Sequence, residues 1–350
     1  HLKNTSNNLS TIYSTSYQNK IYNQIAKLKK YKNYTIEHPL LITNPYGTNT
    51  TSVYMYFKTS DELQATYTIH CEGYNDFSRT LNNNTLSGYT TNHEYLLVGA
   101  IPGQINTITV TLTNKQGNPV DTLSWSYNAP SLQGGDQYLT VDCDDANTSS
   151  LSNGLYTVLG NDVTEDSEEQ AYMRLYDNDG ILRSEIPMIS YRSHRILFED
   201  NTMYFSISST KIVGMDQTGY ISRIYDTGNY KLHHDYIFDD NNNLLVLASE
   251  KNAKTSEDKI IMIEKDSGNI TELVDLIDLL PNYYSTTSMP DVEEDLDWMH
   301  INSLALVDKT SLIISSRETS TIIKLDNIYS NPTIDYMIGS DNFWQESGYD

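Results

Sequence analysis

The second half of the chain repeats a pair of short apolar strands, and this repeat restricts the available folds more than any other feature of the sequence. The first strand of each pair begins near residues 153, 201, 242 and 310, and Asn201–Ile207 and Asn242–Ala248 are typical examples. In the first three pairs a partner run with an Asp-x-x-Gly-type turn follows, at residues 175–180, 214–219 and 263–268. Short strands that recur at intervals of roughly 40–50 residues are typical of β-propeller blades. We therefore predict an all-β chain with a β-propeller over residues 136–350.

The number of blades indicates that the propeller is incomplete in this chain. Residues 136–350 provide four to five blades of roughly 40–50 residues each. A propeller must close to hide its strand edges, and no closing strand is visible before Asp350. We expect either an unusually small propeller or one that lacks its last blades, with further polypeptide removed or carried on a separate chain.

A different strand pattern precedes the repeat. Short alternating strands, such as Gln64–Ile69 and Asn106–Leu112, are separated by turn residues between Thr35 and Pro130. This spacing predicts a small β-sandwich over residues 35–130. Residues 1–34 are expected to form a loose tail and one helix from Ser10 to Tyr34, because apolar residues recur there at near-helical spacing.

The charge of the chain excludes some classes of partner. Its 46 acidic and 23 basic residues give a formal net charge of −23. A field of that sign repels phosphate backbones and anionic headgroups, so we expect neither nucleic-acid nor membrane-surface partners. No apolar run approaches the ~18 residues that a membrane span requires. The chain opens at His1 without a methionine, which a clipped leader or a cloning junction would explain equally well. Whether Cys71 and Cys143 are disulfide-bonded, and whether the protein is a homodimer, is left open.

Cofactor motifs are absent from the sequence. No Gly-x-Gly-x-x-Gly follows a strand, and neither a P-loop nor a Gly-x-Ser-x-Gly elbow occurs. We therefore expect no cofactor and no nucleotide-based group donor.

Histidines at equivalent places in the repeat are the candidates for chemistry. His194 and His234 each lie four residues before a Phe at the start of a strand pair, which places them on neighbouring blades. Side chains alternate along a strand, so His233 and His234 are not expected to enter one channel together, and the repeat favours His234. In the next blade His300 and Asn302 would share a strand face, and the strand that follows ends at Arg317.

These residues favour anion binding over metal binding. A His, Asn and Arg cluster without carboxylate partners suits the oxygens of an anion, and inner-strand residues converge on the central channel of a propeller. Metal binding is the competing interpretation. Asp235 is the only carboxylate close in sequence and cysteine is missing, so we expect no metal.

The ordered set of motifs resembles the bacterial aryl-sulfate sulfotransferase family. The resemblance rests on His233-His234-Asp235, Asp297-Trp-Met-His-Ile-Asn-Ser303, Ile313-Ile-Ser-Ser-Arg317 and Ile338-Gly-Ser340, in order between about Tyr191 and Trp344. The segment around Asn44-Pro45-Tyr46 resembles the N-terminal sandwich of that family more loosely.

The resemblance implies a six-bladed, extracytoplasmic bacterial propeller, whether periplasmic, secreted or anchored at the cell surface. The enzyme would transfer sulfuryl groups between phenols through a sulfohistidine, without a nucleotide donor. Its partners would be small phenols and aryl sulfates. Arg317 and His300 would hold sulfate oxygens, with His234 acting on the phenolic oxygen. Asn302, His233 and His194 would be substrate-binding residues.

One departure from the family pattern leaves an alternative open. The attacking histidine of the family follows the Ser-Ser-Arg motif, and no histidine follows Arg317 in this chain. The sequence therefore names no nucleophile. A non-catalytic extracellular propeller that binds a ligand remains the alternative.

Overall fold

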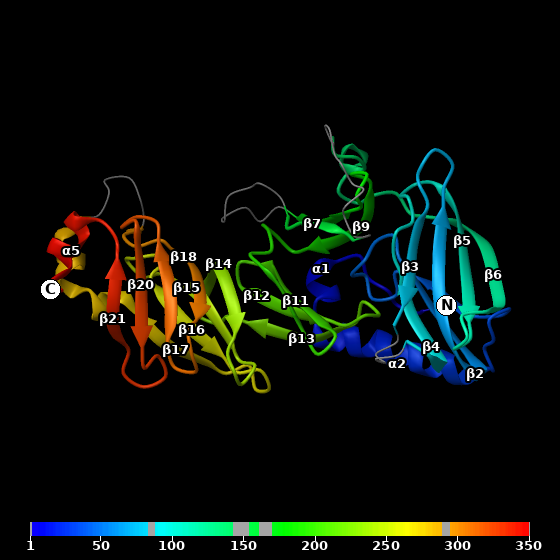
Figure 1. The fold of residues 1–350 in the computed structure, drawn as a ribbon, viewed down its shortest axis with the longest axis horizontal. Helices are drawn as coiled ribbons and strands as arrows, with labels where there is room; N and C mark the ends of the chain where they lie inside the picture. The colour runs from blue at the N-terminus through cyan, green and yellow to red at the C-terminus, as the bar shows by residue number, and fades with distance from the viewer. Residues whose placement is uncertain (1, 83–87, 143–153, 161–169, 289–294, 350) are drawn as a thin grey trace. The chain divides into compact units, whose positions relative to one another are not determined.

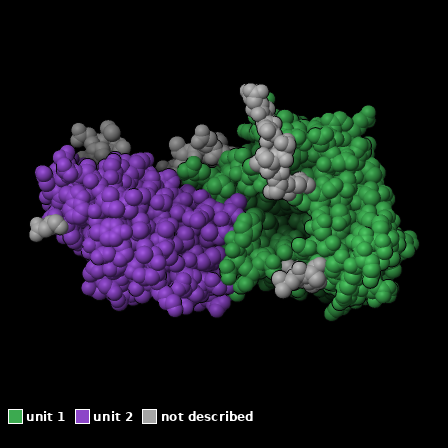
Figure 2. Space-filling model, viewed as in Figure 1, with its two compact units in different colours: residues 1–193, 198–204, 213–224 green, residues 194–197, 205–212, 225–350 purple. Residues whose placement is uncertain are grey.

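The fold is described from a computed structural model of the chain. It describes residues 2–82, 88–142, 154–160, 170–288 and 295–349. The chain divides into two compact units, of which the first holds residues 1–193, 198–204 and 213–224 and the second holds residues 194–197, 205–212 and 225–350 (Figure 2). Cys71 is buried in the first unit, and Cys143 lies outside the described residues.

The first unit opens with two helices where one was expected (Figure 1). α1 spans Leu9–Ile12 and α2 spans Thr15–Tyr31. The helices are separate because Ser14 has an extended backbone, and its side chain caps α2 by accepting a hydrogen bond from Tyr17 N. The residues before them are not loose, since the Lys3 backbone exchanges two hydrogen bonds with the Gln24 side chain.

The predicted sandwich is present and is organised by one long strand. β2 (Val53–His70) pairs through its first half with β1 and β4, and through its second half with β3 and β5, while β6 pairs with β5. The register of β2 against β4 shifts between Lys58 and Leu63, where the strand passes from one sheet to the other. The remaining strands are β1 (Leu40–Thr43), β3 (Phe77–Leu81), β4 (Thr90–Leu97), β5 (Ile105–Thr113) and β6 (Pro119–Asn128).

The repeat units form antiparallel sheets in the order of the sequence. One sheet has three strands, β7 to β9, and three sheets have four strands each, β10 to β13, β14 to β17 and β18 to β21. None of these sheets closes on itself among the described residues. The predicted fold class, a β-sandwich followed by propeller sheets, is therefore confirmed. The strands are β7 (Tyr156–Val158), β8 (Ala171–Tyr176), β9 (Leu182–Met188), β10 (Ile196–Glu199), β11 (Thr202–Ser208), β12 (Lys211–Met215), β13 (Ile221–Asp226), β14 (Tyr230–Phe238), β15 (Leu244–Glu250), β16 (Lys259–Ile263), β17 (Ile270–Asp275), β18 (Ile301–Leu306), β19 (Leu312–Ser316), β20 (Thr321–Asp326) and β21 (Thr333–Ile338).

The core of the second unit lies between its two complete sheets. β15 is buried on both faces from Leu244 to Ala248, which explains its continuous apolar run. Leu304, Leu312 and Ile314 of the next sheet belong to the same apolar cluster. The segment between β17 and β18 carries α3 (Leu276–Leu279) and α4 (Pro281–Thr286). Two further short helices are the 3-10 turn η1 (Asp136–Tyr138) and α5 (Asp341–Ser347).

Asp235 joins the first strands of the three four-stranded sheets. Its carboxylate lies 2.8 Å from Arg195 Nη1, just before β10, and accepts a hydrogen bond from Leu304 N in β18 at 3.2 Å. The neighbouring Tyr236 donates to the Arg195 carbonyl and accepts from Ser206 N. These contacts hold together the strand ends from which the candidate histidines project.

Candidate active site

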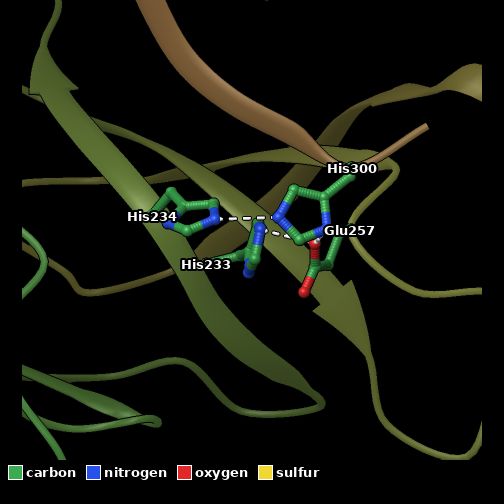
Figure 3. A group of neighbouring side chains, drawn as sticks. All are labelled: His233, His234, Glu257 and His300. Carbon is green, nitrogen blue, oxygen red and sulfur yellow. Dashed lines mark hydrogen bonds and ion pairs between the residues drawn. The ribbon is translucent and has the colours of Figure 1, made fainter. Parts of the chain in front are cut away.

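Four side chains converge at the first strands of the second unit. His233 and His234 lie on β14, Glu257 precedes β16, and His300 stands immediately before β18. Each offers a nitrogen or carboxylate oxygen, and these four atoms lie within 4.8 Å of one another. In Figure 3 the four side chains point toward a common centre. His233, Glu257 and His300 are buried, with relative exposures of 2, 8 and 7%.

Strained backbone brings these side chains together. His234, Glu257 and His300 have φ angles of 33°, 58° and 47°, in the left-handed region that residues other than glycine adopt uncommonly. The register of β14 against β15 shifts between Leu232 and Tyr236, so the two histidines lie in a bulge. The expectation that His233 and His234 cannot share one site is therefore wrong, because the bulge breaks the strand alternation.

The contacts within the cluster are close. Nε2 of His234 lies 2.9 Å from Nε2 of His300. Nε2 of His233 lies 2.6 Å from Oε2 of Glu257, and the same oxygen contacts Nδ1 of His300. The His233 ring is 4.0 Å from the His234 ring and 4.9 Å from the His300 ring, measured between centroids. The three imidazoles and the carboxylate thus form one connected network.

Asp297 links this network to Arg317. Its Oδ2 atom lies 2.6 Å from Nδ1 of His300 and 3.2 Å from Nη2 of Arg317. The Arg317 guanidinium also pairs with Glu318, and the Arg317 backbone N donates to the His300 carbonyl at 3.1 Å. The Arg317 side chain is 55% exposed, so part of its guanidinium remains accessible to a ligand.

Two predicted site residues lie outside this cluster. Asn302 is the extra residue of a bulge, since Ile301 pairs with Ser316 and Ser303 pairs with Ser315, and its amide oxygen accepts from Ser315 Oγ at 2.5 Å. His194 precedes β10, where its backbone N donates to Ser206 Oγ. His300 itself precedes β18 with a left-handed backbone, so simple alternation does not relate it to Asn302.

The prediction of a cluster without carboxylate partners is wrong. Glu257 and Asp297 both contact His300, whereas Asp235, the carboxylate closest in sequence, pairs with Arg195. Asp297 could have been found, because it precedes His300 by three residues in the same motif. Glu257 carries no such signal, since it comes from a loop of the preceding sheet.

Burial sets the protonation of Glu257. Desolvation raises the pKa of its carboxyl above the ordinary value, and the contact with His233 opposes that rise. Asp297 contacts Nδ1 of His300, which leaves Nε2 of His300 facing His234. A proton between the two Nε2 atoms can reside on either ring, so the pair can accept or release a proton at a bound ligand.

Two models of known protein families match the sequence of this chain. The family model described as Arylsulfotransferase (ASST) matches residues 140–350, and the model described as Arylsulfotransferase Ig-like domain matches residues 40–129. The chain belongs to the arylsulfotransferase family. The resemblance noted in the sequence is confirmed. Membership of the arylsulfotransferase family supports a sulfotransferase activity in general.

Solved structures show only distant similarity to this arylsulfotransferase-family chain. A protein of unknown function from Bacteroides caccae is 11% identical to this chain. The match covers 81% of this chain and 96% of that chain, with a TM-score of 0.32. A putative 6-phosphogluconolactonase from Bacteroides fragilis is 12% identical, with 83% and 82% covered and a TM-score of 0.33. The Pan2 WD40 domain of Neurospora crassa is 12% identical, with a TM-score of 0.33. The match covers 54% of this chain and 47% of that chain. No curated protein matches the sequence.

The helices of this arylsulfotransferase-family chain are short or polar. Among the described residues, none is both long enough and apolar enough to cross a membrane.

Proposed function

We propose that this protein moves a sulfuryl group from an aryl sulfate to a phenol through a sulfohistidine intermediate, without a nucleotide donor. Family membership supports the sulfotransferase class. The observation that carries the proposal is the His234–His300 pair, whose Nε2 atoms lie 2.9 Å apart on neighbouring sheets beside an accessible arginine. The ligands would be small phenols and aryl sulfates, in an extracytoplasmic bacterial location.

The reaction divides into two displacements at sulfur. In the first, an imidazole nitrogen forms a bond to sulfur while the bond from sulfur to the aryl oxygen breaks, and the departing phenolate takes up a proton. In the second, the acceptor phenol gives its proton to a base while its oxygen displaces the imidazole from sulfur. By analogy with phosphoryl transfer, both transition states are loose and place negative charge on the leaving and sulfuryl oxygens.

The described residues suit the proton and charge requirements of these steps. The His234–His300 pair would exchange protons with the phenolic oxygens, and Asp297 would stabilise the cationic form of His300. The guanidinium of Arg317 would donate to two sulfuryl oxygens. Asn302, His233 and His194 are proposed as substrate contacts. The attacking histidine is not assigned, since the family pattern puts it after Arg317, where this sequence has none.

A chromogenic donor tests the proposal. The complete native protein that contains this chain is incubated with 4-nitrophenyl sulfate, with and without a phenol acceptor, and 4-nitrophenolate release is followed. We expect release that depends on the acceptor and requires no nucleotide. His300→Gln should lower the rate by roughly 10²–10⁴-fold, the usual contribution of a positioned proton-transfer group. Saturable binding of the aryl sulfate without any release would instead favour a ligand-binding propeller.

A further inference from the structure

We propose that His233, His234, Glu257 and His300 form a binding site for a first-row divalent transition-metal ion such as Zn²⁺. The site goes beyond the proposed transfer reaction. An ion bound by His234 and His300 would occupy nitrogens that the transfer needs for proton exchange, so the metal-bound form would be an inhibited state, and metal binding is measurable without substrate. The four donor atoms lie within 4.8 Å of one another. Donors held at roughly 2.0–2.2 Å from a tetrahedral zinc ion lie about 3.3–3.6 Å from one another, so side-chain rotations are needed to bring these four groups into a closed site.

The donor set selects the class of ion. Three imidazoles and one carboxylate oxygen suit Zn²⁺ and its first-row neighbours, whereas Ca²⁺ and Mg²⁺ prefer oxygen donors alone. The prediction of no metal rested on the absence of cysteine and on Asp235 as the only carboxylate close in sequence, and Glu257 supplies a further carboxylate from another segment of the chain. Its Oε2 atom is buried and makes no hydrogen bond of standard geometry among the described residues, although it lies 2.6 Å from His233 Nε2.

The backbone supports a preformed site. His234, Glu257 and His300 are three of the four donors, and each occupies the left-handed region, which costs free energy for a residue with a side chain. Such positions persist where the surrounding structure fixes them, and they concentrate at ligand sites. Asp297 lies 2.6 Å from Nδ1 of His300, and metal-binding histidines are commonly held by a neighbouring carboxylate of this kind.

Titration calorimetry with Zn²⁺ on chelator-treated protein tests the site. We expect one ion per chain, with Mg²⁺ and Ca²⁺ giving no heat that saturates at this stoichiometry. Glu257→Gln and His300→Gln should each weaken binding by about 10²-fold or more, and Asp297→Asn by about 10–100-fold. His70→Gln is the matched control, because His70 is exposed and pairs with Asp76 in the sandwich; its affinity for Zn²⁺ should equal that of the wild type.

The wild type alone provides a second test that does not depend on the folding of a variant. Co²⁺ bound by imidazole nitrogens in a four- or five-coordinate site gives an intense visible absorption, which should saturate at one equivalent and be abolished by Zn²⁺. Absence of this absorption, or equal Zn²⁺ affinity in the wild type and in folded His300→Gln, would overturn the site. Neither result depends on aryl sulfate turnover, so failure of the metal site and failure of the proposed reaction are distinguishable.

Discussion

Individual residues of the cluster occupy backbone conformations that their sequence does not favour. Few residues with a side chain enter the left-handed region, yet His234, Glu257 and His300 hold it here. Alternation along a regular strand predicted the wrong direction for His233, because it takes no account of the bulge in β14. The histidines themselves could be chosen from the sequence by their repeat-equivalent positions, whereas Glu257 could not, since it comes from a loop brought in only by the fold.

Substitution of Arg317 tests the role of a single residue in binding the sulfuryl oxygens. A guanidinium presents a planar fork that fits two sulfuryl oxygens, whereas lysine supplies a single compact charge. Arg317→Lys should lower turnover in the complete native protein by about 10²–10³-fold while leaving the fold intact, because the fork stabilises charge that develops in the transition state. The measurement is turnover per folded molecule, with the melting temperature recorded alongside.

The control for this substitution is Arg223→Lys, on an exposed position of β13. It should leave turnover unchanged. Unchanged turnover with a lowered melting temperature in Arg317→Lys would mean that Arg317 only joins Asp297 and Glu318, and would contradict its catalytic assignment.

At the scale of elements, the apolar patterns in the sequence predicted the positions of the strands. They did not predict how the strands and helices are connected. The repeated apolar runs became β11, β15 and β19, and the longest apolar run belongs to β15, which is buried on both faces. The passage of β2 between two sheets, and the break between α1 and α2 at Ser14, depend on packing and capping that the apolar spacing does not encode. The bulges that carry the candidate site belong to this second group.

Asp235 is expected to stabilise the junction of three elements. It accepts from Arg195 and from Leu304 N, and it is buried. Asp235→Ala should reduce the free energy of unfolding by about 1–3 kcal/mol, because it leaves a buried backbone N–H without its acceptor. Asp235→Asn, which keeps an acceptor of similar shape, should cost less. Urea denaturation measures both, and equal stability of Asp235→Ala and the wild type would show that the contact contributes nothing.

His93 makes the sandwich sensitive to acid. Its ring is fully buried, stacks on Phe57 at a centroid distance of 4.4 Å and contacts Tyr95. Desolvation lowers its pKa from 6.5 to about 4, so the unfolded chain binds the proton more readily than the folded chain. Stability from this group is therefore complete above about pH 6.5 and is lost as the pH falls toward about 4, by on the order of 3 kcal/mol.

Urea midpoints recorded across this pH range test the effect in the wild type and in His93→Gln. The variant lacks the titrating ring, so its loss of stability on acidification should be smaller by the amount due to His93. Parallel pH profiles for the two proteins would contradict the assignment.

At the scale of the whole molecule, the repeat and the ordered motifs predicted the fold class and the family, and both are confirmed. They succeeded because a propeller is built from one unit repeated, so each strand pair repeats the same apolar pattern. The network around His300 could not be predicted in the same way. It gathers Glu257, Asp297 and the two histidines of β14 from three separate segments, and only the packing of successive sheets brings them together.

Mass-spectrometric detection of the sulfated acceptor tests the central claim most directly. The complete native protein is given an aryl sulfate and a different phenol, and the products are identified by mass. The proposed function predicts that the sulfuryl group appears on the acceptor phenol in proportion to the donor phenol released, and that His234→Gln and His300→Gln suppress both products together. Release of inorganic sulfate in place of sulfated acceptor, or undiminished transfer by both folded variants, would contradict it.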